Sequence, residues 1–242
     1  MAEAPPAPEV AGGVRPTTEP RRVFVGVRVS TATANQLSGA GETLARRARD
    51  AKQDWRFVAP SSFHLTLKFL GWTRTETLGP LRDALATAVR GTERITFRAS
   101  RLGGFPALDR ATVVWAGLDD QGAAAITALA AKVEAACVTL GFAPADHPFH
   151  PHITLARLRE VASAKEVVLP VAEQMFGESR VHEVMLYESY TKSTGSVYRE
   201  LAQIPFKMPE RTSPAAPERQ TTPVELGASD DTDDGWPRGQ HL

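Results

Sequence analysis

The sequence predicts an α+β fold of two similar lobes, with one polar-faced strand from each lobe turned toward a shared cleft. Three observations predict it. Strand-like and helix-like stretches alternate from about residue 21 to 207. An alternating His-x-Thr stretch occurs once on each side of a middle near residue 105. Apolar residues make up 42% of the 242 residues, which is enough to bury a sizeable core.

The chain divides into three parts by composition. Residues 1–20 and 208–242 are rich in Pro, Ala, Thr and charged residues without periodicity, so we expect two disordered arms around one domain at 21–207. The acidic run at 230–234 is typical of a solvated terminus. The Pro-x-x-Pro pattern at Pro5 to Pro8 could bind a polyproline-recognising domain, but such patterns are common in disordered arms.

The first part of the domain mixes both periodicities. Thr31 or Thr33 is expected to cap the first helix. The Gly39-Ala40-Gly41 within that helix is an incomplete dinucleotide fingerprint outside a strand-to-helix turn, so we give it no weight. The expected elements are a strand from Arg22, a helix to about Asp50, a strand at 55–58, a turn at 60–62, the strand of His64, a helix at 75–90, a strand at 95–102, a turn at 103–106 and a strand at 112–118.

The second part repeats the mixture. Its long apolar helix has Ile126, Leu129, Val133 and Ala136 at helical spacing. The expected elements are a helix at 121–140, a proline-rich approach to the strand of His152, a helix around 163–176, and strands near 181–190 and 197–204.

Composition limits the classes of protein to consider. Formal net charge is zero and charged residues make up 23%, so the overall electrostatics do not require a long nucleic-acid duplex or an acidic membrane. Cys137 is the only cysteine, which excludes an internal disulfide framework and fits a reducing compartment. We find neither a secretory signal nor a run of about 18–20 apolar residues. We therefore expect a cytoplasmic, soluble monomer without a membrane partner.

The stretch 63–71 is the first motif. It alternates apolar and polar residues strictly, as a half-buried strand does. Positions two apart share a face, so we expect His64, Thr66 and Lys68 on one face and Leu65, Leu67 and Phe69 on the other.

The stretch 151–157 is the second motif, with His152 and Thr154 in the same relation. A single His-x-Thr is weak, because a strand histidine is more often structural. Two such strands, one on each side of the middle, indicate an active site.

The chemistry of the two motifs suits a phosphodiester. An ordinary histidine pKa of about 6.5 lets one imidazole act as general base while a second acts as general acid near neutral pH. Threonine hydroxyls on the same face can donate to the non-bridging oxygens as negative charge builds. This scheme requires no metal ion, and the sequence lacks the Gly-rich phosphate loop and the acidic cluster of a metal-dependent nuclease.

Other residues are weaker candidates. His147-x-x-His150-x-His152 has ligand types that suit zinc, but no cysteine or carboxylate completes the set, so we expect no metal. Lys68 could add positive charge on the face of His64, or be a solvated lysine. His182 has no matching threonine and is interpreted as structural.

The aromatic residues have two interpretations. Phe63 or Tyr198 could stack on a base, although packing is the better expectation for each. Trp55 and Trp115 are expected in the core.

The two His-x-Thr-apolar motifs resemble the signature of the two-histidine (2H) phosphoesterase superfamily. The longer stretches HLTLKFLG and PHITLAR resemble its branch of bacterial and archaeal RNA 2′,3′-cyclic phosphodiesterases, the LigT-like or 2′-5′ RNA ligase family. The resemblance covers nearly all of 21–207. Supporting stretches are RVFVGV at 22–27, WRFV at 55–58, GFP at 104–106, VWAG at 114–117, LYES at 186–189 and the segment from Gly195 to Tyr198.

The resemblance implies a bilobal, pseudo-symmetric fold with two mainly antiparallel sheets facing a central cleft and helices outside. It implies cofactor-free and metal-independent opening of RNA 2′,3′-cyclic phosphate ends, or of cyclic nucleotides, to 2′-phosphomonoesters, with weak reverse 2′-5′ ligation. By position, His64 and His152 are the catalytic pair, with His152 as base and His64 as acid, although the chemistry permits either order. Thr66 and Thr154 hold the phosphate.

Arg157 matches an arginine of the family motif and is expected to contact phosphate or ribose. Strict alternation puts it on the opposite face from His152, so this role needs a bulge or a strand end. A plain surface arginine is the alternative.

Two alternatives to the leading function stay open. The same fold could act on another cyclic phosphate or a nucleotide metabolite. The cleft could also bind RNA ends without turnover, although a module that only binds has no need for two proton-transfer groups.

Overall fold

The computed structural model describes residues 19–192 and 195–207. Nearly all of the two predicted arms, at 1–20 and 208–242, lies outside these residues, as do the Pro5–Pro8 pattern and the acidic run. The described part forms one compact unit.

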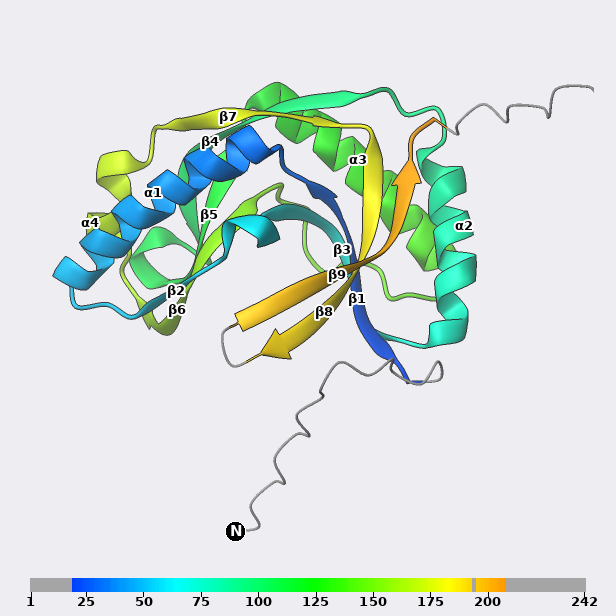
Figure 1. Cartoon of the computed structure of the whole chain (residues 1–242), viewed down its shortest axis with the longest axis horizontal. Helices are drawn as coiled ribbons and strands as arrows, with labels where there is room; N and C mark the ends of the chain where they lie inside the picture. Colours follow the sequence, from blue (N-terminus) through cyan, green and yellow to red (C-terminus); the bar gives the residue numbers. More distant parts are fainter. Residues whose placement is uncertain (1–18, 193–194, 208–242) are drawn as a thin grey trace, which may run out of the picture. The chain divides into compact units, whose positions relative to one another are not determined.

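The strands form one continuous antiparallel sheet, which bends into two lobes (Figure 1). Its order is β7-β4-β5-β6-β3-β1-β8-β9, with β2 paired to β6. The strands are β1 (Arg21–Arg28), β2 (Trp55–Phe57), β3 (His64–Thr73), β4 (Ile95–Phe105), β5 (Ala111–Leu118), β6 (Ile153–Ala162), β7 (Met175–Val181), β8 (Glu183–Lys192) and β9 (Gly195–Pro205).

The two predicted sheets are therefore joined edge to edge, and the joint is a single residue pair between β3 and β6, Leu65 with Ile153. We call β3, β1, β8 and β9 the His64 lobe, and β6, β5, β4 and β7 with β2 the His152 lobe. The lobes are not the two halves of the sequence that we expected around residue 105. β4 precedes that middle but belongs to the His152 lobe, and β8 and β9 return from the end of the domain to the His64 lobe.

The helices tie the lobes together. α1 (Thr31–Asp50) follows β1 of the His64 lobe but packs against β7, β2 and β6 of the His152 lobe. α2 (Leu78–Val89) covers β8 and β9, and α3 (Asp120–Thr139) packs against α2, β4 and β3 (Figure 1). α4 (Lys165–Val168) is a short helix against α1.

Most of the predicted elements are present, with four differences. Ser30, not Thr31 or Thr33, caps α1, because its hydroxyl accepts from the Thr33 backbone N–H at 3.1 Å. The expected turn at 103–106 is the end of β4. The helix expected at 163–176 is only α4 with a 3-10 turn at 169–171, and it gives way to the unpredicted strand β7.

The fourth difference concerns α3. We expected no membrane-length apolar segment, yet α3 is long and apolar enough by length and composition to pass as one. Its alanines give it that composition. Its buried stripe, which includes Ile126, Leu129 and Val133, packs in the core.

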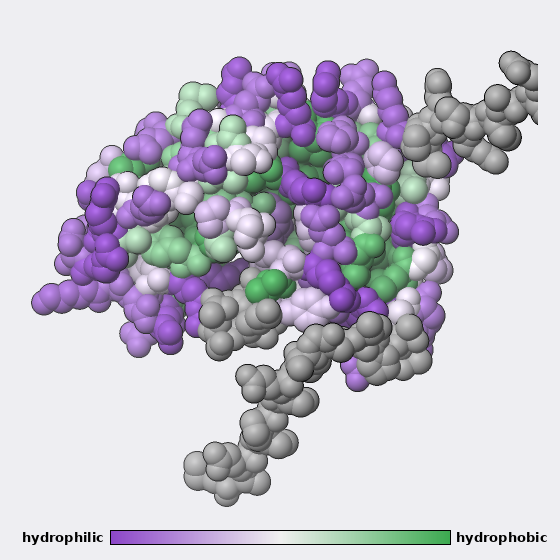
Figure 2. All heavy atoms as spheres, viewed as in Figure 1, coloured by the Kyte–Doolittle hydropathy of each residue, from purple (hydrophilic) through white to green (hydrophobic). Residues whose placement is uncertain are grey.

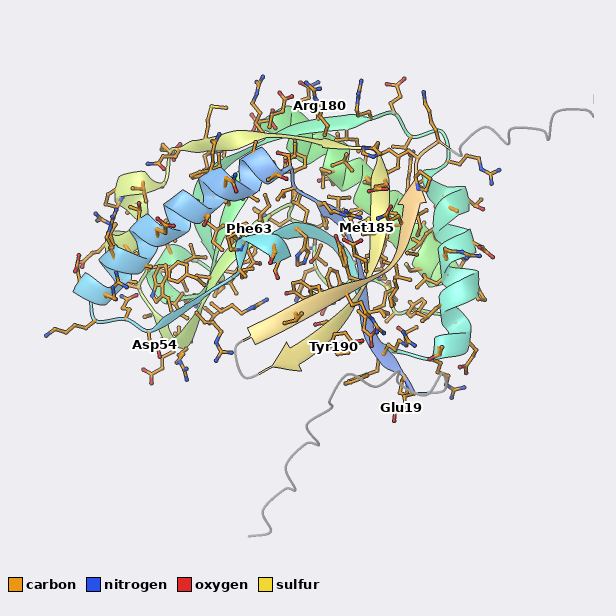
Figure 3. The ribbon with its side chains drawn as sticks, in the orientation of Figure 1. Glu19, Asp54, Phe63, Arg180, Met185 and Tyr190 are labelled. Atoms are coloured by element: carbon orange, nitrogen blue, oxygen red, sulfur yellow. The ribbon has the colours of Figure 1, made fainter. Side chains whose placement is uncertain are left out.

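Polar and apolar side chains separate on the surface. Figure 2 shows polar side chains along the edge formed by α1 and β7, with apolar patches nearer the middle of that face. Phe63, which directly precedes His64 and is labelled in Figure 3, is buried, as its packing interpretation expected. Trp55 is also buried, as expected.

Candidate active site

The two motif strands meet at the joint between the lobes. Leu65 and Ile153 face each other there and are both fully buried. Their neighbours along each strand point to the opposite face of the sheet. The single pair therefore gathers His64, Thr66, His152 and Thr154 on one face, and each is half-buried.

A bulge after each threonine changes the alternation. In β3 the pairing with β1 skips Leu67, and in β6 the pairing with β5 skips Leu155. Such an extra residue returns the following side chains to the other face. Arg157 is therefore exposed on the face of His152, and the bulge that its predicted role requires is present.

The bulge in β3 overturns the prediction for Lys68. Instead of sharing the face of His64, Lys68 is buried on the helix side of the sheet. Its ammonium donates to a carboxylate oxygen of Glu134 on α3 at 2.7 Å and to the carbonyl of Ala143 at 2.9 Å. Phe69, expected in the core, is 63% exposed, and its ring lies 5.6 Å from Phe24 on the site face.

His64 is oriented by two hydrogen bonds. Its Nδ1 lies 2.7 Å from the carbonyl oxygen of Ser62, and its Nε2 lies 3.1 Å from the hydroxyl of Thr66. A carbonyl can only accept, so Nδ1 carries a proton and Nε2 holds the lone pair of the neutral ring. The rings of Phe24 and Tyr198 lie 4.9 and 4.8 Å from the imidazole.

His152 repeats the arrangement. Its Nδ1 lies 2.7 Å from the carbonyl oxygen of His150, again two residues earlier, so its neutral ring also exposes Nε2 as the base. The Phe105 ring packs edge-on at 4.9 Å from the imidazole, and Trp115 lies 6.3 Å away. Trp115 is thus half-buried at the site rather than a core residue as expected.

The electrostatic setting lowers the pKa of both histidines below 6.5. For His64 the main cause is burial, with the charges of His152 and Arg157 adding to it against the raising effect of the Ser62 carbonyl. For His152 burial again leads, with His150 and Arg157 adding to it against the His150 carbonyl. Arg157 therefore contributes to lowering the pKa of both imidazoles.

Several site residues escaped the sequence analysis. Gly26 lies against His64, because a Cβ there would sit 3.6 Å from Cδ2 of that ring and 2.7 Å from the carbonyl oxygen of Leu65. Arg56 pairs with Arg157 across β2 and β6, so both side chains share a face. Neither guanidinium has a hydrogen-bond or ion-pair partner within residues 19–192 and 195–207. In the sequence, Arg56 lies in a predicted strand just before the first motif. No local pattern distinguishes it from an ordinary surface arginine.

A cavity of about 320 Å³ opens beside His64. Tyr187 and Tyr198 form one wall, and burial raises the pKa of Tyr187 to about 12, so its phenol stays neutral. The rest of the lining comes from the end of β1, the start of α1 and the turn before β3: Arg28, Val29, Thr31, Ala34, Asn35, Pro60, Ser61, Ser62 and Phe63, with Glu200 from β9.

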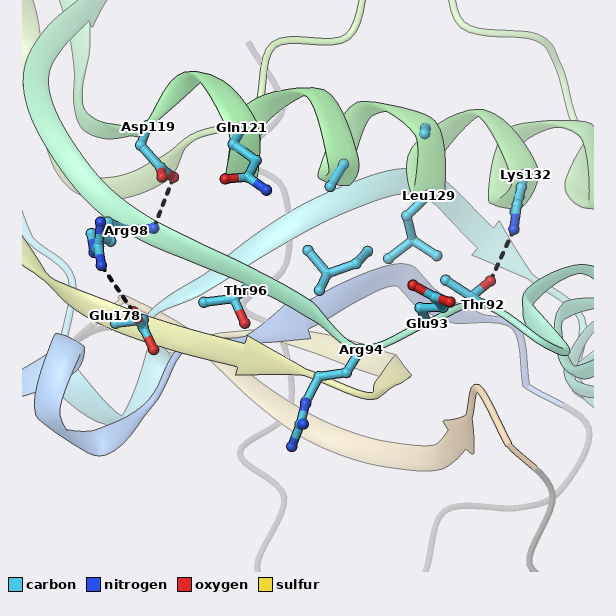
Figure 4. A pocket seen from close by; sticks show the side chains of 13 residues that line it. Thr92, Glu93, Arg94, Thr96, Arg98, Asp119, Gln121, Leu129, Lys132 and Glu178 are labelled. Atoms are coloured by element: carbon cyan, nitrogen blue, oxygen red, sulfur yellow. Dashed lines mark hydrogen bonds and ion pairs between the residues drawn. The ribbon is translucent and has the colours of Figure 1, made fainter.

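A separate pocket of about 480 Å³ lies at α3, β4 and β7, and neither histidine lines it (Figure 4). Some of its polar groups have partners within the pocket. Arg98 contacts Glu178 at 3.5 Å and its backbone N–H donates to Asp119, while Lys132 donates to Thr92. Glu93 and Arg94 also line the pocket.

The zinc interpretation of the three clustered histidines gains no support. His147 is strongly exposed and lies 3.7 Å from Asp146. In the described part of the chain, no group of three His, Cys, Asp or Glu residues is arranged to hold a metal ion. His182 lies exposed between β7 and β8, where its carbonyl accepts from Phe206.

Comparisons with known proteins identify the family. The model of the 2′-5′ RNA ligase superfamily matches residues 21–192. The chain belongs to this family. That is the family that the two motifs predicted.

Its relatives include enzymes of known name. An RNA 2′,3′-cyclic phosphodiesterase of Aeropyrum pernix is 30% identical over 150 residues, which cover 61% of this chain and 84% of the relative. A crystal structure of a Thermus thermophilus protein matches with a TM-score of 0.63 and 27% identity, covering 76% of this chain and 97% of that one. LigT of E. coli matches with a TM-score of 0.59 and 27% identity, covering 77% and 97%, and it has also been solved with 3′-AMP.

Proposed function

We propose that this protein is an RNA 2′,3′-cyclic 3′-phosphodiesterase, which opens the cyclic phosphate at an RNA end to a 2′-phosphomonoester. The observation that carries the proposal is the gathering of two His-Thr pairs on one face, with both Nδ1 atoms bound to carbonyls and both Nε2 atoms turned away from the backbone, that of His64 toward the Thr66 hydroxyl. The names of the relatives support the substrate class.

The reaction needs one proton taken and one given. Water attacks phosphorus as Nε2 of His152 takes its proton, and the bond from phosphorus to the 3′ oxygen breaks as Nε2 of protonated His64 gives that oxygen a proton. The cavity beside His64 supports this order, because the departing 3′ oxygen belongs to the ribose and the cavity has room for the nucleoside.

The threonines and Arg157 stabilise the charge on phosphate. In the free protein the Thr66 hydroxyl lies 3.1 Å from Nε2 of His64. A bound phosphate draws that hydroxyl away and frees Nε2, while Thr154 and Arg157 contact the other oxygens. Two imidazoles supply both proton transfers, so the step requires no Lewis acid. We include weak ligation in the proposal, because a 5′-hydroxyl in place of water would form a 2′-5′ phosphodiester with the same leaving oxygen.

The test is product identity. Cyclic 2′,3′-AMP incubated with the protein should give 2′-AMP, resolved from 3′-AMP by chromatography, at the same rate with and without EDTA. His64→Ala and His152→Ala should each slow the conversion by at least about 100-fold. A smaller loss in either variant, or a 3′-phosphate product, would overturn the proposal.

A further inference from the structure

A row of exposed aromatic side chains continues from the site along β3. The register pairs Phe69 with Phe24 and Trp72 with Arg22 on β1. Phe24 and Arg22 are two residues apart and so share a face. Phe69 and Trp72 therefore lie on the face that carries His64.

This arrangement depends on a second bulge. The β1–β3 pairing skips Leu70, so Phe69 and Trp72 reach the same face although they are three residues apart. The contacts follow the same line, since the Phe24 ring lies 4.9 Å from His64 and 5.6 Å from Phe69.

Both outer rings are unusually open. Trp72 is 72% exposed and Phe69 is 63% exposed, although large aromatic side chains are usually mostly buried. Trp72 follows Gly71, whose φ of 70° belongs to the left-handed region. The indole of Trp72 is thus open to solvent on the face of the sheet that carries His64.

Positive charge accompanies the rings. Arg22 is exposed beside Trp72 and has no hydrogen-bond or ion-pair partner among the residues that the structure describes. Aromatic faces with an interleaved free cation are the combination that holds single-stranded nucleic acid, since bases stack and phosphates pair with the cation.

We propose that Phe69, Trp72 and Arg22 form a stacking platform for the nucleotides on the 5′ side of the cyclic phosphate end. Trp72 lies at most about 20 Å along β3 from Thr66, given a rise of about 3.3 Å per residue, a distance that a few nucleotides of single-stranded RNA span. The platform rests on the proposed function and adds that the protein prefers oligonucleotides to mononucleotides.

The experiment measures kcat/KM against RNA length, with cyclic phosphate ends on one, two, three, four and six nucleotides. The wild type should gain efficiency with length and then level off. Trp72→Ala should keep the mononucleotide value within about twofold and lose roughly 5- to 100-fold on the longest RNA, the range for one stacked base. Trp72→Phe should retain most of the gain, and Leu169→Ala, which removes an exposed apolar residue from the other lobe, should change nothing.

Arg22→Gln gives an independent readout. The logarithm of the affinity for a six-nucleotide RNA, plotted against the logarithm of salt concentration, should lose about 0.7 from its slope, the share of one phosphate on a single strand. Trp72→Ala should leave that slope unchanged.

The outcomes separate the two proposals. Mononucleotide turnover with no dependence on length, or a length dependence that Trp72→Ala preserves, overturns the platform and leaves the proposed function standing. Failure to open any cyclic phosphate overturns the proposed function; the platform then stands only if Trp72→Ala weakens binding of the six-nucleotide RNA by fluorescence anisotropy. A lower molecular mass of Trp72→Ala in solution, with length preference unchanged, assigns this face to a second copy and overturns the platform.

Discussion

The strands of His64 and His152 follow one plan up to the bulge and differ after it. Each histidine binds a carbonyl two residues earlier through Nδ1, and each threonine is followed by a skipped leucine. At the next exposed position the His64 strand has Phe69 and the His152 strand has Arg157. After the shared part, the exposed side chain on the site face is thus an aromatic ring in one strand and a guanidinium in the other. In the proposed function the shared part holds the phosphate, and Arg157 adds positive charge on the His152 side.

Removing either histidine should give the largest effect, and the pH dependence of the two variants tests whether the two motifs have different roles. Each His→Ala variant should lose roughly 100- to 10,000-fold in kcat, the range for one acid–base group. If His152 is the base, the residual activity of His152→Ala should no longer fall at acid pH, whereas that of His64→Ala should no longer fall at alkaline pH. Activity measured from pH 4 to pH 9 tests this. If His152→Ala instead loses the alkaline limb and His64→Ala the acid limb, His64 is the base and His152 is the acid.

Substitution of Arg157 tests whether the cation of the His152 strand contributes to activity. Arg157→Ala should lower kcat/KM about 10- to 100-fold, because a hydrogen bond to a charged group contributes about 1.5–3 kcal/mol. Arg56→Ala, its paired neighbour across β2 and β6, should lose less than about fivefold, because Arg157 and not Arg56 lowers the pKa of both histidines. Equal losses would mean that the two arginines act as one clamp.

Substitutions of Gly26 and Gly103 test how tightly the backbone is packed in the His64 lobe and in the His152 lobe. The Cβ of Gly26→Ala would meet the backbone carbonyl of Leu65 at the joint, whereas that of Gly103→Ala would meet the ring of Trp115. We expect each to cost about 1–3 kcal/mol in the free energy of unfolding, with Gly26→Ala the worse because backbone cannot move aside. Imidazole NMR should show His64 disturbed in one variant and His152 in the other. Gly39→Ala, within α1 and with open space around it, should be neutral or stabilising by up to about 1 kcal/mol.

Of the two motif strands, only the His64 strand has a buried lysine, Lys68. Lys68→Met should destabilise the fold by about 1–3 kcal/mol, because the Glu134 carboxylate and the Ala143 carbonyl both lose the donor that they share, while kcat per folded molecule stays near wild type. Urea unfolding measures the stability, and Lys132→Met on the exposed side of α3 is the control. A large loss of kcat would place Lys68 in the chemistry after all.

The same pair has a pH signature. Burial favours the neutral form of Glu134, but the hydrogen bonds from Lys68 and from the Ala145 backbone outweigh it and hold its pKa below 4.5. The stabilisation is therefore present above about pH 4.5 and is lost as pH falls through the lower folded pKa. Lys68→Met should flatten that part of the stability curve.

The pH optimum should show the smallest effect. Burial holds both histidine pKa values below 6.5, so near pH 7 most free molecules have two neutral imidazoles and lack the acid. The bell of kcat/KM should therefore peak below pH 6.5, whereas kcat should peak at higher pH, because a bound phosphate anion stabilises the imidazolium. Coincident profiles would contradict the assignment.

Local pattern in the sequence was enough to predict most elements and that each motif histidine shares a face with its threonine, because period-two alternation is a property of a few neighbouring residues. It was not enough for Lys68 or Phe69, since a bulge depends on how β3 pairs with a distant strand. The aromatic rings around His64 come from β1, β8 and β9, and those around His152 come from β4 and β5. No periodicity reveals such neighbours, and the same limit hid the division of the strands between the lobes.

The return of β8 and β9 to β1 has a consequence for synthesis on the ribosome. Both histidines and all of the His152 lobe are translated before residue 183, yet β1 and β3 wait for β8 to complete their side of the sheet. A nascent chain that stops short of β9 carries the whole acid–base set but lacks Tyr198 against His64 and Glu200 in the cavity wall. The wall beside His64 is therefore completed only when the last strand of the domain has emerged.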